Sequence, residues 1–418
     1  MNAAEIQAAI ARPGVFPQRT PQAVADVLVQ TARLWLAADS PWRARAIATA
    51  PEPTGFSAAM VNEAVTLTFE ALARATFSDC KFPGEPPHRI THILSGNVPA
   101  PGIASICRGL LLQAVNLVKT AQRDPVFPML FVESLRTVDP ELAECVTVLH
   151  WPRSEAGLTR AALAEADAVI LYGDDDSIAG VRALTPTRAK FFGYGHKISF
   201  GIVGREARAF HQSSTGGRDS RRAKGSLNPA NSSAGASPSN HGDPLSTDLP
   251  ALAAWDASVY DQQGCMSPHV FFAADGAREF AAALAAAMEN YQQRIPRGSL
   301  SIEEAAQATA VREAYEFRSA NDPKVKIWTS APPYPWTVIY DEDPLFSPSC
   351  LNRTIFVKPI STLNSMQAWA GKISTVGIAP WNDQSRNSVS HWAERVCPIG
   401  QMQHPPMLFF GESLTSLT

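Results

Sequence analysis

The sequence has no run of about 18 consecutive apolar residues, and it does not begin with the basic and then apolar stretch of a secretory signal. A membrane span and export are therefore not indicated, and we expect a cytoplasmic protein. A surplus of basic residues is also missing, because the formal net charge is −3. Neither nucleic acid nor an anionic membrane is suggested as a partner.

Cysteine is scarce and scattered. The six cysteines form no C-x-x-C pair and no Cys/His spacing of a zinc site, so neither a disulfide framework nor a metal site is expected. Most of them should be buried thiols. Cys265 differs, because it follows a glycine and precedes a Ser-Pro turn. A thiol exposed at a domain cleft is a nucleophile, whereas a cysteine buried at a strand start is only structural, and the residue alone leaves both interpretations open.

Large aliphatic side chains are nearly absent from residues 211–244, where Leu227 is the single example. Such a segment buries too little apolar surface to offset its ordering entropy. We predict a low-complexity mobile loop over residues 211–248.

What is present is an alternation of helix and strand patterns. Residues 1–80 are rich in alanine with helical periodicity, which predicts a helical segment packed on the next domain. Strands are predicted at 115–121, 145–151, 167–173 and 189–195, with helices at 102–114, 126–138, 157–166 and 176–184 between them. Nearly continuous apolar strands in this order indicate an α/β fold with a doubly wound parallel sheet over 81–210. Nucleotides bind at the carboxyl ends of such strands.

A second α/β domain is predicted over 249–418. Its first helix begins near Ala277 and places Phe280, Leu284, Met288 and Tyr291 on one face. Ser301 to Glu304 reads as the capping box of the next helix, and strands are predicted at 324–330, 335–341 and 353–360.

Six blocks of the sequence carry a resemblance to a known family. They read SGNVPAPG, VNLVKTAQRDP, LYGDDDS, FFGYGHKISFG, YDQQGCMSPHV and, near the C-terminus, RVCPIGQMQHPP. In this order and spacing they resemble the aldehyde dehydrogenase superfamily, and more closely its branch of fatty-acyl-CoA reductases of the bacterial luminescence type. The resemblance extends from about Ile90 to Glu412. It implies an aldehyde dehydrogenase-like fold, with a nicotinamide cofactor domain and a catalytic thiol domain.

The resemblance also assigns roles to residues. Cys265 matches the nucleophile, and Asn97 matches the asparagine that stabilises the oxyanion together with the backbone N–H of Cys265. The expected cofactor contacts are Lys119, Gln122, Arg123, Gly173, Gly195 and Phe346. NADPH is expected over NADH, because Gln122 and Arg123 replace the family's glutamate and remove repulsion toward a 2′-phosphate.

Two departures from the family qualify the assignment. Asp174 to Asp176 follow Gly173 and would repel a pyrophosphate, so we expect them to cap the next helix. Gly193 stands where hydrolytic members have the glutamate that activates water, so hydrolysis of an acyl-enzyme should be slow. His196 and His269 are candidates for proton transfer, although a structural role is the commoner one for a lone histidine.

The sequence therefore predicts NADPH-dependent reduction of an acyl thioester to an aldehyde through an acyl-cysteine. The expected partners are an acyl-CoA, or an acylated carrier, acyltransferase or synthetase subunit, and we expect a homo-oligomer. Three alternatives stay open: a CoA-acylating dehydrogenase of short-chain aldehydes, a non-redox acyl transferase or carrier that uses the same cysteine, and a catalytically silent member of the fold.

Overall fold

The computed structural model describes residues 3–12, 14–75, 85–96, 98, 100–205, 248–360, 366 and 369–406. Asn97 lies outside the described residues, and so does the segment predicted as a mobile loop, except for its last residue.

Five parallel strands form the first sheet in the order β3-β2-β1-β4-β5. They are β1 (Arg89–Ile93), β2 (Val115–Lys119), β3 (Val146–Leu149), β4 (Ala168–Tyr172) and β5 (Lys190–Tyr194). The connecting helices are α6 (Ala100–Leu111), α7 (Val126–Val138), α9 (Ala156–Ala164) and α10 (Asp175–Leu184). The predicted alternation is confirmed. Chain direction across the sheet reverses between β1 and β4, which is where ligands bind in doubly wound sheets.

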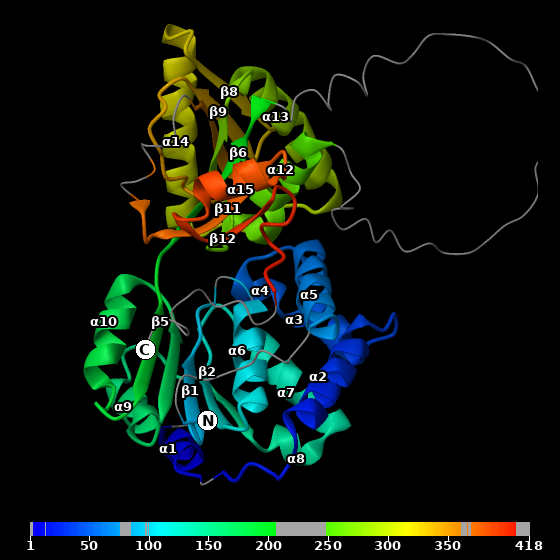
Figure 1. Ribbon diagram of the computed structural model, residues 1–418, viewed down its shortest axis with the longest axis vertical. Helices are drawn as coiled ribbons and strands as arrows, with labels where there is room; N and C mark the ends of the chain where they lie inside the picture. The colour runs from blue at the N-terminus through cyan, green and yellow to red at the C-terminus, as the bar shows by residue number, and fades with distance from the viewer. Residues whose placement is uncertain are drawn as a thin grey trace, which may run out of the picture.

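The N-terminal helices pack beside this sheet (Figure 1). They are α1 (Ala3–Ile10), α2 (Pro21–Leu36), α3 (Pro41–Thr49), α4 (Pro51–Thr54) and α5 (Ala58–Ala73), and the short α8 (Pro140–Ala143) follows α7. Trp35 of α2 stacks on Phe69 of α5 with ring centroids 4.3 Å apart. Its indole N–H donates to Ser134 Oγ of α7 at 2.8 Å, so the buried tryptophan joins the N-terminal helices to the sheet's own helix layer.

Seven strands form the second sheet, in the order β12-β11-β6-β7-β10-β9-β8, with β8 antiparallel to its neighbour. They are β6 (Ile198–Val203), β7 (Pro268–Ala273), β8 (Val325–Thr329), β9 (Thr337–Asp341), β10 (Thr354–Pro359), β11 (Ile373–Ala379) and β12 (Ala393–Pro398). The helices of this domain are α12 (Leu249–Ser258), α13 (Ala277–Arg294), α14 (Ile302–Asn321) and α15 (Asp383–Val389). The predicted apolar face of α13 is buried, and the capping box of α14 is present.

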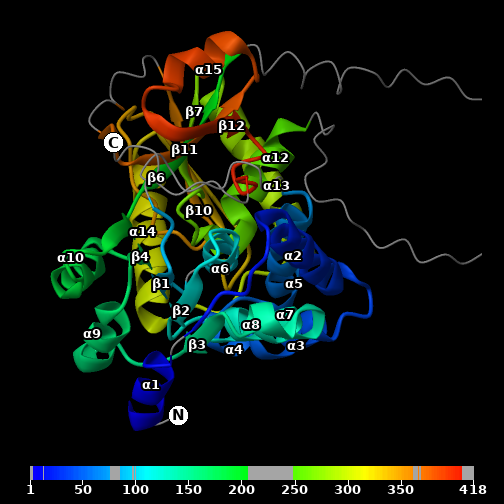
Figure 2. The ribbon, with the colours of Figure 1, turned by 60° about the horizontal axis from the view of Figure 1, so that its bottom comes forward.

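The predicted domain boundary at residue 210 is too late. β6 pairs in parallel with β7 and β11, so it belongs to the second sheet. The chain therefore crosses between the domains at residues 195–197, directly after β5. Figures 1 and 2 show this crossing as the green segment between the two sheets. The prediction is wrong because an apolar strand pattern does not reveal which sheet the strand joins.

Candidate active site

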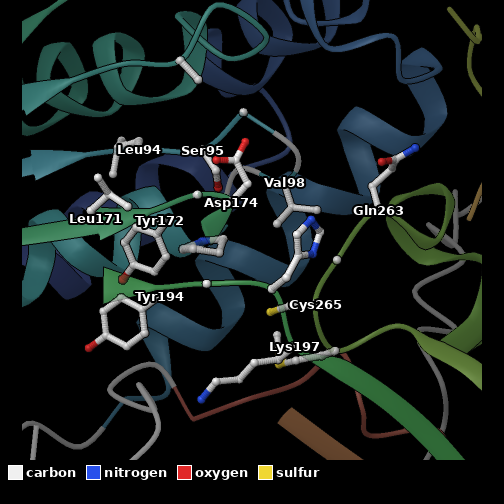
Figure 3. A pocket seen from close by; sticks show the side chains of 18 of the residues that line it. Leu94, Ser95, Val98, Leu171, Tyr172, Asp174, Tyr194, Lys197, Gln263 and Cys265 are labelled. Carbon is white, nitrogen blue, oxygen red and sulfur yellow. The ribbon is translucent and has the colours of Figure 1, made fainter. Parts of the chain in front are cut away.

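A cavity of about 1720 Å³ lies between the two sheets. One side is the carboxyl edge of the first sheet, and its wall is formed by residues that directly follow β1, β2, β4 and β5. The opposite side is formed by the segment before β7 and by residues at the amino ends of β6, β11 and β12. A further part extends between α5, α6 and the C-terminal segment 401–406. Cys265 lies where these parts meet (Figure 3).

An unusual turn presents Cys265. The 3-10 helix η2 (Val259–Gln262) precedes it, and Tyr260, Asp261 and Gln262 all have left-handed backbone, with φ of 55°, 50° and 66°. Such conformations are costly for residues with a side chain, so surrounding contacts must hold them. The Arg353 guanidinium does so, because its Nε donates to Asp261 Oδ1 at 2.9 Å and both side chains are buried. The strained turn fixes where the thiol enters the cavity.

The backbone of Cys265 is anchored to the second sheet. Ser199 Oγ of β6 donates to the Cys265 carbonyl oxygen at 2.8 Å, and the backbone N–H of Thr375 donates to Ser199 Oγ at 3.1 Å. The side chain of Cys265 is exposed to the cavity, whereas the other described cysteines are buried: Cys107, Cys145, Cys350 and Cys397. The contrast expected from the sequence therefore holds for these cysteines, and Cys80 lies outside the described residues.

The surroundings of Cys265 favour the neutral thiol. The cavity walls shield the sulfur from bulk water, and this desolvation raises its pKa. Glu394 raises it further. The backbone N–H of Cys265, the Lys197 ammonium and the Ser374 hydroxyl act in the opposite direction without cancelling the effect. In this state the thiol keeps its proton at neutral pH, so a nucleophilic role requires a base.

Sequence reasoning missed three residues around this thiol: Ser199, Ser374 and Glu394. They lie on β6, β11 and β12, which are neighbours in the second sheet although they are far apart in the chain. No local motif marks them. Only the order of the strands brings them to Cys265.

Most of the predicted cofactor residues line the cavity. Lys119, Gln122, Arg123, Gly173 and Gly195 all do so. Phe346 does not, and its ring instead lies behind two residues that do, with centroids 4.9 Å from Trp369 and 6.1 Å from His269.

Lys119 and Arg123 differ in how they are engaged. Lys119 is the last residue of β2, at the carboxyl edge of the first sheet, and its Nζ donates to the carbonyl oxygen of Thr120 at 3.3 Å. Partial burial lowers its pKa. Arg123 is exposed, and its guanidinium pairs with Glu304 Oε1 at 3.0 Å, at the beginning of α14. An anionic group in the cavity would therefore compete with Glu304 for Arg123.

Of the three acidic residues after Gly173, Asp174 caps the next helix as predicted, whereas Asp175 and Asp176 lie in its first turn. Asp174 is the N-cap of α10, and its Oδ1 accepts the backbone N–H of Ser177 at 2.6 Å. Both Gly173 and Gly195 lie against this helix. A Cβ at Gly195 would come within 2.9 Å of Asp175 Oδ1, so the absence of side chains lets β5 lie close to α10.

Position 193 faces α10 and not the thiol. A Cβ at Gly193 would lie 2.9 Å from the ring of Phe191 and 3.1 Å from Ile178 Cγ2. A glutamate at this position would therefore meet a packed surface.

The two candidate histidines both line the cavity. The backbone N–H of Ser349 donates to His269 Nδ1 at 3.0 Å, so the ring proton is on Nε2. Burial and the nearby His196 lower the pKa of His269 to about 4. His269 is thus a neutral ring that presents N–H, and not a lone pair, at its other nitrogen.

Comparison with known proteins identifies the family. The profile of the family described as acyl-CoA reductase (LuxC) matches residues 83–407. The chain belongs to this family. Among its relatives, the long-chain acyl-protein thioester reductase 2 of Photobacterium leiognathi is 25% identical over 334 residues, which are 77% of this chain and 60% of that protein. The corresponding reductase of Aliivibrio fischeri is 25% identical over 315 residues, 72% of this chain and 56% of that one. The chain thus spans less than two thirds of the length of these relatives.

Solved structures support the aldehyde dehydrogenase-like fold. A NAD-dependent benzaldehyde dehydrogenase from Corynebacterium glutamicum has a TM-score of 0.60 at 11% identity, covering 97% of this chain and 86% of that one. Aldehyde dehydrogenase 21 from Physcomitrella patens has a TM-score of 0.62 at 12% identity, covering 98% and 82%. At these identities the likeness establishes the fold alone. Among the residues that the structure describes, no helix combines the length and apolar character needed to cross a membrane.

Proposed function

We propose that this protein reduces an acyl thioester to an aldehyde, with Cys265 holding the acyl group and NADPH as the preferred cofactor. The observation that carries the proposal is the position of Cys265. It is the exposed thiol among the described cysteines, and it lies where the carboxyl edge of the first sheet meets the rest of the cavity. The names of the relatives, which describe long-chain acyl-protein thioester reductases, support the same reaction class.

The residues at the carboxyl edge of the first sheet fit a nicotinamide dinucleotide in part. Lys119 and Gln122 supply donors for ribose hydroxyls, and Arg123 supplies a cation for a 2′-phosphate. The N-terminus of α10 fits less well, because the Asp174 carboxylate already accepts the N–H of Ser177 there. The bound cofactor would supply the hydride for reduction of the acyl group.

The other part of the cavity fits an acyl chain. Its apolar lining comes from α5 and the residues after it, from α6 and its preceding loop, from η2 and from the C-terminal segment: Leu67, Ala71, Ala75, Val98, Ala104, Tyr260, Pro405 and Pro406. The same elements also contribute the polar residues Thr68, Glu70, Arg74, Gln401, Gln403 and His404. An alkyl chain bound here would bury apolar surface while its thioester carbon lies at Cys265. Asn97 and the backbone N–H of Cys265 are the donors that we infer for the oxyanion.

A burst experiment tests the proposal. Enzyme mixed with a long-chain acyl-CoA and no cofactor should release about one CoA per active site and then stop, because Gly193 stands where hydrolytic members have the glutamate that activates water. The acyl group should be found on Cys265 by intact-protein and peptide mass spectrometry, and adding NADPH should convert it to aldehyde.

Two variants give this experiment its control. Cys265→Ala should abolish both the burst and the adduct, whereas Cys145→Ala, which removes a buried thiol far from the cavity, should keep them. Continuous CoA release without cofactor would contradict the proposal, and so would an adduct on another cysteine or a failure of any thioester to oxidise NADPH. A burst and adduct without any NADPH oxidation would favour the non-redox acyl transferase.

A further inference from the structure

Three adjacent strands bring polar groups to the sulfur of Cys265. Lys197 directly precedes β6, Ser374 is on β11 and Glu394 is on β12. The register pairs Ile373 with Ala393 and Thr375 with Arg395, so Ser374 and Glu394 stand side by side on neighbouring strands. All three line the cavity with Cys265.

The side chains of Lys197 and Glu394 form an ion pair. Lys197 Nζ contacts Glu394 Oε1, and both side chains are about three-quarters buried, with 26% and 23% exposed. The lysine therefore holds the carboxylate in one orientation and leaves Oε2 available. In the view of Figure 3 the Lys197 side chain runs past Cys265, and its ammonium points away from the sulfur.

A β-bulge aims the third group. The register between β11 and β6 shifts between Ile373 and Thr375, so Ser374 has no register partner on β6. Bulges near active sites redirect a side chain, and here the Ser374 hydroxyl forms a hydrogen bond with the sulfur of Cys265. The amino ends of these strands thus bring a hydroxyl against the sulfur and an ion pair into the same part of the cavity wall.

Among the titratable groups of the cavity wall, Glu394 is the one that best fits the role of a base. The cavity wall contains the carboxylates Glu70, Asp174, Asp175 and Glu394, the cations Arg74, Lys119, Arg123, Arg153, Lys197 and Lys372, the histidines His150, His196, His269 and His404, and the phenols Tyr172, Tyr194 and Tyr260. Glu394 is the carboxylate that acts on the titration of Cys265. His269 presents N–H at its unbonded nitrogen, and burial raises the pKa of Tyr172, which remains a neutral phenol.

We propose that Glu394, held by Lys197, is the base that takes the proton of Cys265 when the thiol attacks an acyl thioester. The inference rests on the proposed function and supplies the base that the neutral thiol of Cys265 requires. In the step, the S–H bond of Cys265 breaks and its proton goes to Glu394 Oε2, while the sulfur forms a bond to the thioester carbon. The C–S bond to the donor then breaks, and the same proton passes to the departing sulfur. No other reactant is needed.

Alkylation of Cys265 tests the coupling without any acyl substrate. The rate at which iodoacetamide modifies Cys265, followed by peptide mass spectrometry across pH, reports the fraction of thiolate. Glu394→Gln should shift this profile down by about one pH unit, because the negative charge is lost and Lys197 is released toward the sulfur. Lys197→Met should shift it upward. Glu313→Gln, which removes an exposed carboxylate on α14, is the control and should leave it unchanged.

Acylation separates a base from a mere electrostatic influence. Glu394→Gln should slow the burst of CoA release by about 100-fold or more, even though its thiol is alkylated faster at neutral pH. The reason is that a more acidic Cys265 becomes the better leaving group, so an intermediate without a proton donor returns to reactants. The melting temperature of each variant is measured alongside to show that it is folded.

The outcomes distinguish the two proposals. An unshifted alkylation profile in both variants would overturn the inference, and so would acylation that accelerates in parallel with alkylation. If the profiles shift in opposite directions but the unmutated enzyme is not acylated by any thioester, the coupling of the pair to Cys265 is supported. The proposed function, and with it the role of Glu394 as the base for acylation, would then be wrong.

Discussion

The choice between NADPH and NADH depends on single side chains at the edge of the first sheet. Arg123 is the cation that would attract a 2′-phosphate, but in the structure it is paired with Glu304 at 3.0 Å. Glu304 also belongs to the capping box of α14, where its side chain accepts the backbone N–H of Ser301. The proposed preference for NADPH would therefore be set by a competition between a phosphate and a carboxylate.

Replacement of Glu304 by glutamine should strengthen NADPH binding several-fold and leave NADH binding nearly unchanged. Glutamine still serves in a capping box, so the helix start is retained while the charge that competes for Arg123 is removed. The opposite change is expected for Gln122→Glu, which places a carboxylate near the phosphate and should weaken NADPH far more than NADH. Fluorescence titration with both cofactors measures the ratio, and equal effects on both would show that these residues do not face the 2′-position.

The residues of the candidate site differ in how readily they can be identified from the sequence alone. Cys265 is predictable because a thiol between a glycine and a Ser-Pro turn is unusual and matches a family block. Glu394 is not, because its role depends on the adjacency of β6, β11 and β12 and on an ion pair with Lys197 across almost half of the chain. Phe346 matches a family residue by sequence, yet the structure has it behind Trp369 and His269.

Among the secondary-structure elements, the C-terminal segment 400–404 is held over the cavity by two charged groups. The Asp256 carboxylate of α12 accepts the backbone N–H groups of Gly400 and Met402. Arg395 donates to the carbonyl oxygens of Gln401, Met402 and His404 at 2.6, 2.8 and 2.9 Å. Burial raises the pKa of Asp256 to about 7, although these N–H groups and Arg395 oppose the shift.

This segment should make stability depend on pH through Asp256. A carboxyl with a pKa of about 7 in the folded state and about 3.9 in the unfolded state binds more protons when folded. The free energy of unfolding therefore falls as pH rises from about 4 to about 7 and is unaffected by this group outside that range.

Urea denaturation of the unmutated protein and of Asp256→Asn at pH 5 and pH 8 measures the difference. The loss of stability should be smaller in Asp256→Asn, while Asp383→Asn, an exposed control, should behave like the unmutated protein. Identical pH dependence in all three would contradict the assignment.

The elements themselves are largely predictable. Apolar runs of strand length that alternate with helical periodicity locate the strands of the first sheet, and Ser301 with Glu304 marks the start of α14 in the sequence alone. The turn that leads to Cys265 is not predictable. Its left-handed residues Tyr260, Asp261 and Gln262 are not glycines, and the buried Arg353 that stabilises them is distant in the sequence.

For the whole molecule, function depends on two sheets that meet along one cavity. The first sheet contributes its carboxyl edge and the second contributes the thiol, Lys197, Ser374 and Glu394. The crossing at residues 195–197 joins the sheets, so Lys197 lies at the junction of the two domains. Sheet membership is a long-range property, and the sequence pattern of β6 gives no indication of it.

The part of the cavity between α5 and the C-terminal segment should set the length of acyl chain that the enzyme accepts. Ala71 lines it from α5, and Tyr260 and Pro405 also belong to the wall that we assign to the chain. In Ala71→Trp the indole would occupy the space of the distal methylenes, and each methylene that is no longer buried costs about 0.8 kcal/mol. The value of kcat/KM should therefore fall at least about tenfold for a tetradecanoyl thioester and change little for a butanoyl thioester.

The matched control for this substitution is Ala58→Trp, which adds the same side chain at an exposed position of the same helix. NADPH oxidation with acyl-CoAs of increasing length measures both variants, and the melting temperature shows whether α5 still packs. An equal loss for short and long chains in Ala71→Trp would mean that the indole disturbs Cys265 or the fold and not the chain. Unchanged activity with every chain length would place the acyl chain elsewhere. A loss that begins at one chain length and grows with each added methylene is the result expected of an acyl chain that extends from Cys265 along α5.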